Sequence, residues 1–342
     1  MTGGRSVWML VPAGVDDPAR VSGGNVYDRA VRDGLRGRGW TVTAVEAADG
    51  AVVPTALDTV PDGALALVDG LVAGWAPAVL AAASVRLRVV VLAHMVAAAF
   101  PDASSDEETA ERRALGCARR VIATSRWTAG VLVQRRLVAH ENVTVAVPGA
   151  SACAASGGGV PDGALICVGV IAPHKGQDVL LAALARLAAV RPAVDWTCTL
   201  VGSTSTFPGF AAAIAEDAAA FGGRVMLTGV RTGAELDDAY RRSAVLVAPS
   251  RVESAGMAIT DALARGIPVI GAAVGGIPDT VASGGALLVA PDDPVAWADA
   301  LYAWMTDAAL RDRLRAEARG ARAALPGWDH TVEAVERALA AA

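Results

Sequence analysis

The sequence contains little lysine and few aromatic residues. Lys175 is the only lysine among 342 residues, so the other formally cationic side chains are arginine. Aromatic residues make up 4% of the chain, whereas alanine, valine and leucine dominate it. Such a composition is typical of a globular protein with a large aliphatic core. The formal net charge of −5 excludes a global electrostatic footprint for nucleic acid, and we expect no nucleic-acid partner.

Long apolar runs are also missing. The longest candidates, residues 71–83 and 89–100, are shorter than the roughly 18 residues of a membrane helix, and glycine, proline or histidine interrupts them. The amino terminus lacks a secretory pattern, because Arg5 is followed by the strand-like segment VWMLV and then by Pro12. These features predict no transmembrane segment and a cytoplasmic location.

Basic side chains occur in several pairs. Arginine pairs stand at 112–113, 119–120, 135–136 and 241–242. Solvated helix faces explain such pairs most simply. A surface that docks on anionic lipid, at the inner face of a membrane, is the alternative interpretation.

The length of the chain predicts two domains, and strands and helices alternate in both halves. In the first half we expect strands at 7–11, 41–45, 65–69, 89–93, 121–124 and 143–147, a glycine loop at 22–24, and helices that include 27–36, 106–117 and 128–138. In the second half we expect strands at 165–168, 196–201, 224–227, 245–248, 269–270 and 286–289, and a last helix at 328–341 with Asp329 as its N-cap. Alternation of this kind predicts doubly wound parallel sheets.

Residues 148–163 differ in composition, since glycine, serine and alanine dominate and no periodicity is visible. We therefore divide the chain into a domain at 1–150, a linker at 151–163, a domain at 164–325 and a terminal segment at 326–342.

The most informative segment is 245–279. A short apolar strand ends at Pro249, Glu253 stands in the following loop, and a helix at 257–264 contains Asp261. Two acids thus have seven residues between them, on either side of a helix start whose free N–H groups would suit a phosphate. In parallel sheets, ligands bind beyond the carboxyl ends of the strands. The segment therefore predicts a phosphate-binding site.

This segment resembles the donor site of nucleotide-sugar glycosyltransferases of retaining family 4. The resemblance rests on the two acids, on the strand after Gly266-Ile267-Pro268 and on the Gly275-Gly276 loop. It implies a GT-B fold, in which two Rossmann-like doubly wound domains enclose a cleft and the last helix crosses back to the N-terminal domain. It also implies that Glu253 lies near the transferred sugar and that Asp261, one methylene shorter than the usual glutamate, accepts hydrogen bonds from the ribose.

The resemblance gives Lys175 a role as well, because the family has a Lys-Gly pair here whose lysine contacts the donor diphosphate. The position fits, since Lys175 follows the strand at 165–168 and precedes a helix. One departure stands out: Val170 replaces an arginine that the family places after the strand glycine. Either Arg251 or His174 takes over its charge, or the stabilisation of the leaving group is weaker.

Further donor contacts follow from the same resemblance. Ala255, Gly256 and Met257 are expected to offer backbone N–H groups, Gly23 and Gly24 to approach the donor from the other domain, and Val230 and Arg231 to contact the base through their backbone. His94 follows a strand and is either a core residue or a contact to the donor sugar or the reacting centre.

We expect no metal ion and no cofactor. Four cysteines, at 117, 153, 167 and 198, are too widely spaced for a metal site and are expected to be reduced and buried. The chain has no Asp-x-Asp motif at a strand end, which metal-dependent glycosyltransferases of the other major fold would need.

The predicted function is thus a retaining, metal-independent transfer of a sugar from a nucleoside-diphosphate sugar to an unidentified acceptor. His94, Lys175 and Glu253 are the predicted catalytic residues. A small-molecule acceptor is favoured over a lipid, and the oligomeric state is left open. The alternatives are a catalytically silent homologue that serves as a nucleotide-binding or scaffold subunit, and a nucleotide-sugar epimerase of the same fold.

Overall fold

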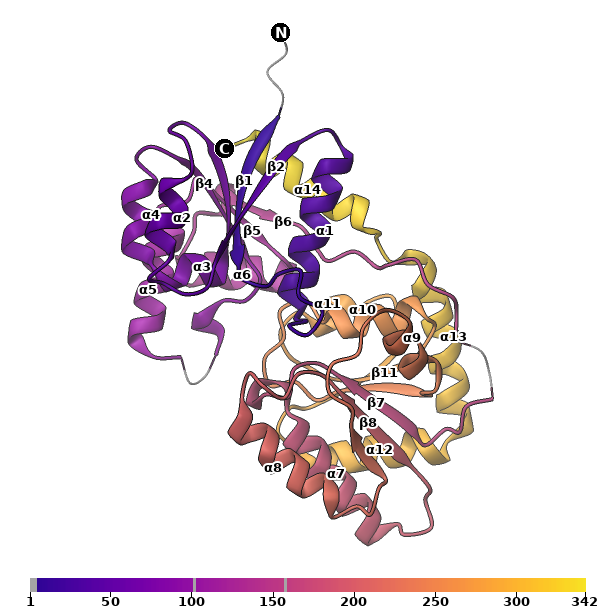
Figure 1. Ribbon diagram of the computed structural model, residues 1–342. Helices are drawn as coiled ribbons and strands as arrows, with labels where there is room; N and C mark the ends of the chain where they lie inside the picture. Colours follow the sequence, from indigo (N-terminus) through magenta and orange to yellow (C-terminus); the bar gives the residue numbers. More distant parts are fainter. Residues whose placement is uncertain (1–4, 101–102, 157–158) are drawn as a thin grey trace. The chain divides into compact units, whose positions relative to one another are not determined.

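The computed structural model describes residues 5–100, 103–156 and 159–342 (Figure 1). The chain divides into two compact units. Unit 1 comprises Met1–Asp17, Gly23–Gly149 and Pro326–Ala342, and unit 2 comprises Pro18–Ser22 and Ala150–Leu325. Each unit contains one six-stranded sheet whose paired strands are all parallel. The predicted α/β fold with doubly wound sheets is therefore confirmed.

Unit 1 has the strand order β2-β1-β3-β4-β5-β6. Its strands are β1 (Ser6–Pro12), β2 (Thr41–Ala47), β3 (Leu65–Asp69), β4 (Arg88–Ala93), β5 (Arg120–Ala123) and β6 (Val143–Val145). Its helices are α1 (Gly23–Gly37), α2 (Val53–Asp58), α3 (Gly70–Trp75), α4 (Pro77–Ala83), α5 (Ser105–Gly116), α6 (Arg126–Gln134) and α14 (Trp328–Ala340), with short 3₁₀ turns η1 (Ala97–Ala99) and η2 (His140–Asn142). The order reverses direction between β1 and β3, which makes this pair a topological switch point.

Unit 2 has the strand order β12-β11-β10-β7-β8-β9, the classical Rossmann order. Its strands are β7 (Ala164–Val168), β8 (Thr197–Val201), β9 (Val225–Leu227), β10 (Val245–Ala248), β11 (Val269–Ala272) and β12 (Ala286–Val289). Its helices are α7 (Gln177–Val190), α8 (Pro208–Ala219), α9 (Gly233–Arg241), α10 (Met257–Ala264), α11 (Ile277–Thr280), α12 (Pro294–Thr306) and α13 (Ala308–Ala324), and a 3₁₀ turn η3 (Pro173–Lys175) precedes α7. The switch point here lies between β7 and β10.

Some of the scarce aromatic side chains anchor the core of unit 2. Trp196, Trp297 and Trp304 are among the largest fully buried residues. The indole N–H of Trp297 donates to the carbonyl of Ala290, and that of Trp304 donates to the carbonyl of Asp162. The rest of this core is aliphatic, so these rings fill volume that valine and leucine alone would leave empty.

The last helix, α14, packs on α1 within unit 1, where the yellow and indigo helices lie side by side (Figure 1). Gly34 of α1 makes this close approach feasible, because a Cβ there would come within 2.4 Å of Val332. Helix α14 begins after Gly327, so the prediction of Asp329 as its N-cap is wrong. Asp329 lies in the first helical turn. An acid in that turn still interacts favourably with the helix dipole.

Other element boundaries also differ from the predictions. Gly23 and Gly24 do not form a loop but open α1, since the chain turns into a helix directly after Ser22. Helix α6 ends at Gln134, short of the predicted 138, because Arg136 adopts a positive φ of 54°. The predicted apolar run at 71–83 is divided between α3 and α4, and Pro77 opens the second helix. Residues 157 and 158 of the predicted linker lie outside the described residues.

The cysteines are free, and burial was predicted correctly for two of them. Cys167 and Cys198 are buried, whereas Cys117 and Cys153 are partly exposed. Among the described residues, no helix is both long enough and apolar enough to cross a bilayer.

One glycine tests how tightly α13 packs in unit 2. Gly285 has a φ of +83°, and a Cβ there would lie 2.7 Å from the Cα of Ala318 in α13. We predict that Gly285→Ala lowers the free energy of unfolding by about 2–4 kcal/mol, through backbone strain and a clash with a helix. Urea unfolding followed by circular dichroism measures this effect.

The control for this substitution is Gly320→Ala, in α13 itself, where an added Cβ meets nothing within 4 Å. It should be neutral or stabilise the protein by up to about 1 kcal/mol, since alanine is the better helix former. Equal unfolding midpoints for the two variants would contradict the close packing of Gly285 on α13.

Candidate functional site

The switch point of unit 2 brings together two of the predicted residues. Lys175 ends the turn that follows β7, and Glu253 lies in the loop that follows the neighbouring strand β10. Because parallel strands present their carboxyl ends at the same edge, these loops meet. The Lys175 ammonium lies 2.6 Å from Oε2 of Glu253 and forms an ion pair with it.

Glycines set the backbone around this ion pair. Gly176 has a φ of +68°, and a Cβ there would lie 2.1 Å from the carbonyl oxygen of Pro249, at the end of β10. Gly275 has a φ of +57°, and a Cβ there would lie 1.9 Å from the carbonyl oxygen of Glu253. The next amide, of Gly276, donates to that carbonyl at 2.9 Å. Larger residues at 176 and 275 would push the loops apart, so these glycines position both charged side chains.

The ion pair is largely shielded from water. The Lys175 side chain is 22% exposed and that of Glu253 is 15% exposed. Burial by itself raises the pKa of Glu253, but the Lys175 ammonium and the amide of Gly256 outweigh it and hold that pKa below its usual value. Glu253 is therefore ionised at neutral pH, and Lys175 already has a counter-charge before any ligand binds.

The amino end of α10 lies beside Glu253. Gly256, with a φ of +66°, occupies the N-cap position, and its amide donates to Oε1 of Glu253 at 3.2 Å. This amide was predicted to bind phosphate, and the structure shows it engaged with a carboxylate instead. The amides of Met257 and Ala258, in the first turn, precede the first intrahelical bonds and keep the capacity to bind an anion.

The loop also contains a side chain that the sequence did not single out. The hydroxyl of Ser254 is buried and has no hydrogen-bond partner among the described residues. The Ala255 carbonyl accepts a hydrogen bond from Thr280, which fixes the loop on α11. Ser254 is thus a hydroxyl next to the helix start whose hydrogen-bonding capacity is unused among the described residues.

Asp261 lies farther along α10, as predicted, beside a different set of charges. Its partner is Arg265 one turn later, at 3.9 Å, and Arg265 also bonds to Asp237 and stacks over the ring of Tyr240. Burial raises the pKa of Asp261 to about 6, against the opposing effect of Arg265. Asp261 is thus the acid at this site that changes charge close to neutral pH.

The sequence left open whether Arg251 replaces the missing arginine at 170. The guanidinium of Arg251 donates hydrogen bonds to both carboxylate oxygens of Asp178, to Asp292 and to the carbonyl of Pro173. These bonds use four of its five N–H donors, and two acids already compensate its charge. Arg251 therefore holds the turn that contains Lys175 in place.

The predicted base-contacting residues, Val230 and Arg231, lie between β9 and α9. Arg231 forms an ion pair with Glu235 at 3.2 Å, one helical turn away. A cavity of about 410 Å³ that runs along β7, β8 and β9 is lined in part by Arg231 and Glu235. The structure thus places Arg231 beside a cavity, on the β9 side of the switch point.

Unit 1 brings together the other three predicted residues. Gly23 and Gly24 open α1, and a Cβ on Gly24 would lie 3.5 Å from the ring of His94. Nε2 of His94 lies 2.9 Å from Asp28 and 3.2 Å from Asp69. Sequence reasoning missed both acids, although Asp69 ends a predicted strand just before a glycine and so marks the carboxyl end of the sheet.

Asp28, Asp69 and His94 are the one group of metal-ligating side chain types found close together in the described residues. The distances from His94 to its two acids are shorter than those between ligands on tetrahedral zinc. Atoms bound tetrahedrally to zinc lie about 3.4 Å apart, given metal–ligand distances of about 2.1 Å. The 2.9 Å between His94 and Asp28 is a hydrogen-bond distance.

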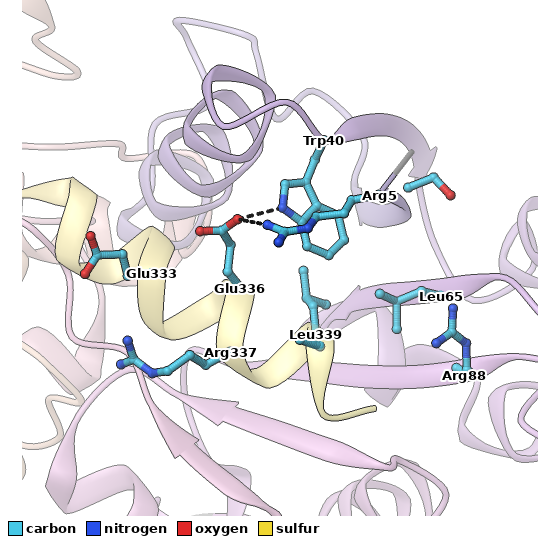
Figure 2. A pocket seen from close by; sticks show the side chains of 10 residues that line it. Arg5, Trp40, Leu65, Arg88, Glu333, Glu336, Arg337 and Leu339 are labelled. Atoms are coloured by element: carbon cyan, nitrogen blue, oxygen red, sulfur yellow. Dashed lines mark hydrogen bonds and ion pairs between the residues drawn. The ribbon is translucent and has the colours of Figure 1, made fainter. Parts of the chain in front are cut away.

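A larger cavity lies elsewhere in unit 1. It measures about 550 Å³ and is formed by α14 and the amino ends of β1, β3 and β4 (Figure 2). There Glu336 accepts hydrogen bonds from the indole of Trp40 and from Arg5, which ties α14 to the sheet (Figure 2). Its position at the opposite end of the strands from His94 makes it a structural joint rather than part of the candidate site.

Comparison with known proteins adds the following. Residues 162–307 match the family described as glycosyl transferases group 1. D-inositol 3-phosphate glycosyltransferase from Stackebrandtia nassauensis is 36% identical over 184 residues, covering 51% of this chain and 41% of that protein. The enzyme of the same name from Corynebacterium efficiens is 30% identical over 263 residues, covering 68% and 61%. The chain spans less than half of the length of the first of these relatives.

Solved structures resemble the chain over almost its full length. A sucrose-phosphate synthase from Thermosynechococcus elongatus matches with a TM-score of 0.77 at 20% identity, over 97% of this chain and 98% of that one. Anabaena HepE in complex with UDP-glucose matches with a TM-score of 0.75 at 17% identity, over 98% and 100%. These likenesses show that the chain has the GT-B fold.

The ion pair at the switch point predicts an asymmetric response to substitution. Lys175→Met should lower the free energy of unfolding by about 1–3 kcal/mol, because it leaves the buried carboxylate of Glu253 without its counter-ion. Adding Glu253→Gln to that variant should restore most of the loss, since the uncompensated charge is removed. Chemical denaturation of the two single variants and the double variant gives the coupling energy.

Simple additivity of the two substitutions would contradict this interpretation. Arg231→Met, at a cation paired with an exposed acid, is the matched control and should change stability by less than about 1 kcal/mol.

Proposed function

We propose, from the premise that residues 162–307 belong to the group 1 glycosyl transferase family, that this chain transfers a sugar from a nucleoside-diphosphate sugar to an acceptor. The observation that carries the proposal is the meeting of Lys175, Glu253 and the amino end of α10 at the switch point of unit 2. A cation, a buried acid and unpaired helix amides together suit a sugar diphosphate.

The chemistry assigned to each group follows from its surroundings. The Lys175 ammonium and the amides at the start of α10 stabilise the negative charge that develops on the leaving diphosphate. Glu253 is ionised and accepts hydrogen bonds from hydroxyl groups of the sugar. When the diphosphate binds Lys175, the ammonium lies between the phosphate and Glu253. Binding therefore leaves neither of the two negative groups without a counter-charge.

The donor and the stereochemistry are part of the proposal. HepE, which shares the fold, has been solved in complex with UDP-glucose, so UDP-sugars are the first donors to test. We further propose transfer with retention of the anomeric configuration and without a metal ion, with His94 as a contact to the sugar or the reacting centre. Proton NMR of the product's anomeric centre tests retention, and assays with and without a chelator test the metal.

The acceptor is proposed from the curated relatives, which are named for D-inositol 3-phosphate. A small phosphorylated polyol is therefore the first acceptor to test, and a lipid acceptor is the alternative. The chain aligns with 41% and 61% of the length of these two relatives.

One observation favours a second candidate, a silent homologue that binds a nucleotide without turnover. Val170 stands where the resemblance expects an arginine, and Arg251 is already bound to Asp178 and Asp292. A missing cation at the leaving group costs roughly 2–4 kcal/mol of transition-state stabilisation. Val170→Arg separates the two candidates: a rise in transfer rate of about tenfold or more supports a weakened transferase, and binding without turnover in both proteins supports the silent homologue.

A thermal-shift panel of nucleoside diphosphates and their sugars tests donor binding. A ligand at 100 times its dissociation constant adds about 2.7 kcal/mol, which is a shift of a few degrees for a domain of this size. We predict a shift with one nucleotide base that is lost in the double variant Lys175→Met/Glu253→Gln. This variant is preferred to Lys175→Ala alone, which leaves Glu253 unpaired and shifts the melting temperature by itself. No shift with any nucleotide would overturn the proposal.

The pKa of Asp261 gives a pH test of the proposed ribose contact. An ionised carboxylate accepts hydrogen bonds from both ribose hydroxyls, and this capacity is lost as Asp261 becomes protonated below its pKa of about 6. Affinity for a UDP-sugar should therefore fall severalfold between pH 7 and pH 5, measured by isothermal titration calorimetry. The donor must be a nucleotide sugar, because a terminal phosphate itself titrates near pH 6.

The matched control is Asp261→Asn, which should bind more weakly at pH 7 and show a flat pH profile. An unchanged pH dependence in this variant would assign the titration to another group and remove Asp261 from the ribose site.

A further inference from the structure

A buried cluster of two acids and one histidine lies at the carboxyl edge of the unit 1 sheet. Asp69 ends β3, His94 follows β4, and Asp28 lies in α1, the helix after β1. Asp28 is 1% exposed and Asp69 is 4% exposed, while the His94 side chain is 17% exposed. The cluster therefore stands at the switch point of unit 1, with only the histidine reaching the surface.

The hydrogen bonds fix which ring nitrogen faces the acids. Nε2 of His94 lies within hydrogen-bond distance of Oδ1 of Asp28 and of Oδ2 of Asp69. Both neighbours are carboxylates, which accept hydrogen bonds when ionised. Nε2 must therefore carry a hydrogen, and the other nitrogen, Nδ1, is left for a different partner.

Asp69 is held in place from its other side. Its Oδ1 accepts hydrogen bonds from the amides of Leu71 and Val72 and caps α3. Asp28 is less well satisfied, because its Oδ2 is buried without a hydrogen-bond partner among the described residues. The two acids thus differ: one is anchored by backbone amides, and the other has the histidine as its main partner.

The charges in this cluster need compensation. Two carboxylates buried side by side are costly unless a cation or a proton offsets them. The other titratable group against the ring is Tyr27, whose ring lies 5.1 Å from that of His94 and whose hydroxyl donates to the carbonyl of Ala146. Thr124, which follows β5, donates a hydrogen bond to the backbone carbonyl of His94. The histidine ring is the compensating group that the cluster itself provides.

We propose that Asp28 and Asp69 are positioning residues that hold the His94 ring in one orientation and in its doubly protonated form, so that Nδ1–H is a fixed hydrogen-bond donor. In that form His94 cannot accept a proton, and it serves the reaction by donating a hydrogen bond to an oxygen of the bound substrate. The substrate contact rests on the proposed function, whereas the state of the ring does not.

The electrostatics of the cluster agree with this geometry. Burial by itself lowers the pKa of His94, but Asp28 and Asp69 outweigh it and raise that pKa to about 10. The pKa of Asp69 is lowered, because hydrogen bonds from His94 and two amides outweigh its burial. Burial raises the pKa of Asp28 to about 6. Asp69 therefore stays ionised, and the protonated ring of His94 compensates the negative charge of Asp28.

The state of the ring can be measured without any substrate. The full chain contains four histidines, so the imidazole signals of a ¹⁵N-histidine-labelled sample are few, and His94→Gln assigns the one of interest. We expect His94 to stay doubly protonated at pH 8, where an ordinary histidine is mostly neutral. In Asp28→Asn and in Asp69→Asn, its titration midpoint should fall by at least one pH unit.

Three results would overturn the proposal: a neutral His94 at pH 8 in the wild type, midpoints unchanged in both asparagine variants, or a stoichiometric metal ion found by elemental analysis of the purified protein and lost in Asp28→Asn. If neither variant folds, as judged by circular dichroism, the titration of the wild-type protein still decides the matter.

An activity measurement then tests the link to the reaction. The wild-type kcat should be flat between pH 7 and pH 9. In Asp28→Asn, kcat should fall at least about twofold over that range as His94 loses its proton, with full recovery at the acidic end. A merely structural role for Asp28 would lower activity equally at all pH values and would contradict the proposal. If no donor supports turnover, the proposed function fails while the titration still reports on the ring.

Discussion

The ion pair between Lys175 and Glu253 is the contact around which unit 2 is arranged. It exists because β7 and β10 are neighbours in the sheet, although Leu165 and its partner Val245 lie far apart in the sequence. The two strands are parallel, so both end at the same edge of the sheet. The glycines at 176 and 275 admit the close loops, and the guanidinium of Arg251 fastens the turn that bears the lysine. Strand order thus decides which charges meet.

The switch point of unit 1 also holds charged groups in contact with one another, but their residue types differ. At its switch point a histidine lies between two buried acids, where unit 2 has a lysine beside one acid. In both cases the charged groups are held by backbone amides as well as by each other, through Leu71 and Val72 in unit 1 and through Gly256 in unit 2. Charges that are already compensated in the folded protein need little reorganisation when a ligand arrives.

The sequence predicted the strands well, because short apolar runs bounded by glycine or proline have few other interpretations. It also predicted that Lys175 and Glu253 lie at strand ends, and the spacing of the acids placed Asp261 in α10. It could not show that Arg251 is consumed by Asp178 and Asp292, since such pairing depends on which loops become neighbours. Asp28 was not predicted as a site residue for the same reason. In the sequence it is one polar residue of an amphipathic helix, and only the fold buries it.

The place of α14 has a consequence for the order in which the chain can mature during synthesis. Unit 2 is complete once Leu325 has left the ribosome, whereas unit 1, begun first, still lacks the helix that packs on α1. Gly149 lies close against the start of this helix, since a Cβ there would come within 2.3 Å of the backbone nitrogen of Trp328. The amino-terminal unit is therefore incomplete, with an apolar face open, until Pro326–Ala342 has been synthesised.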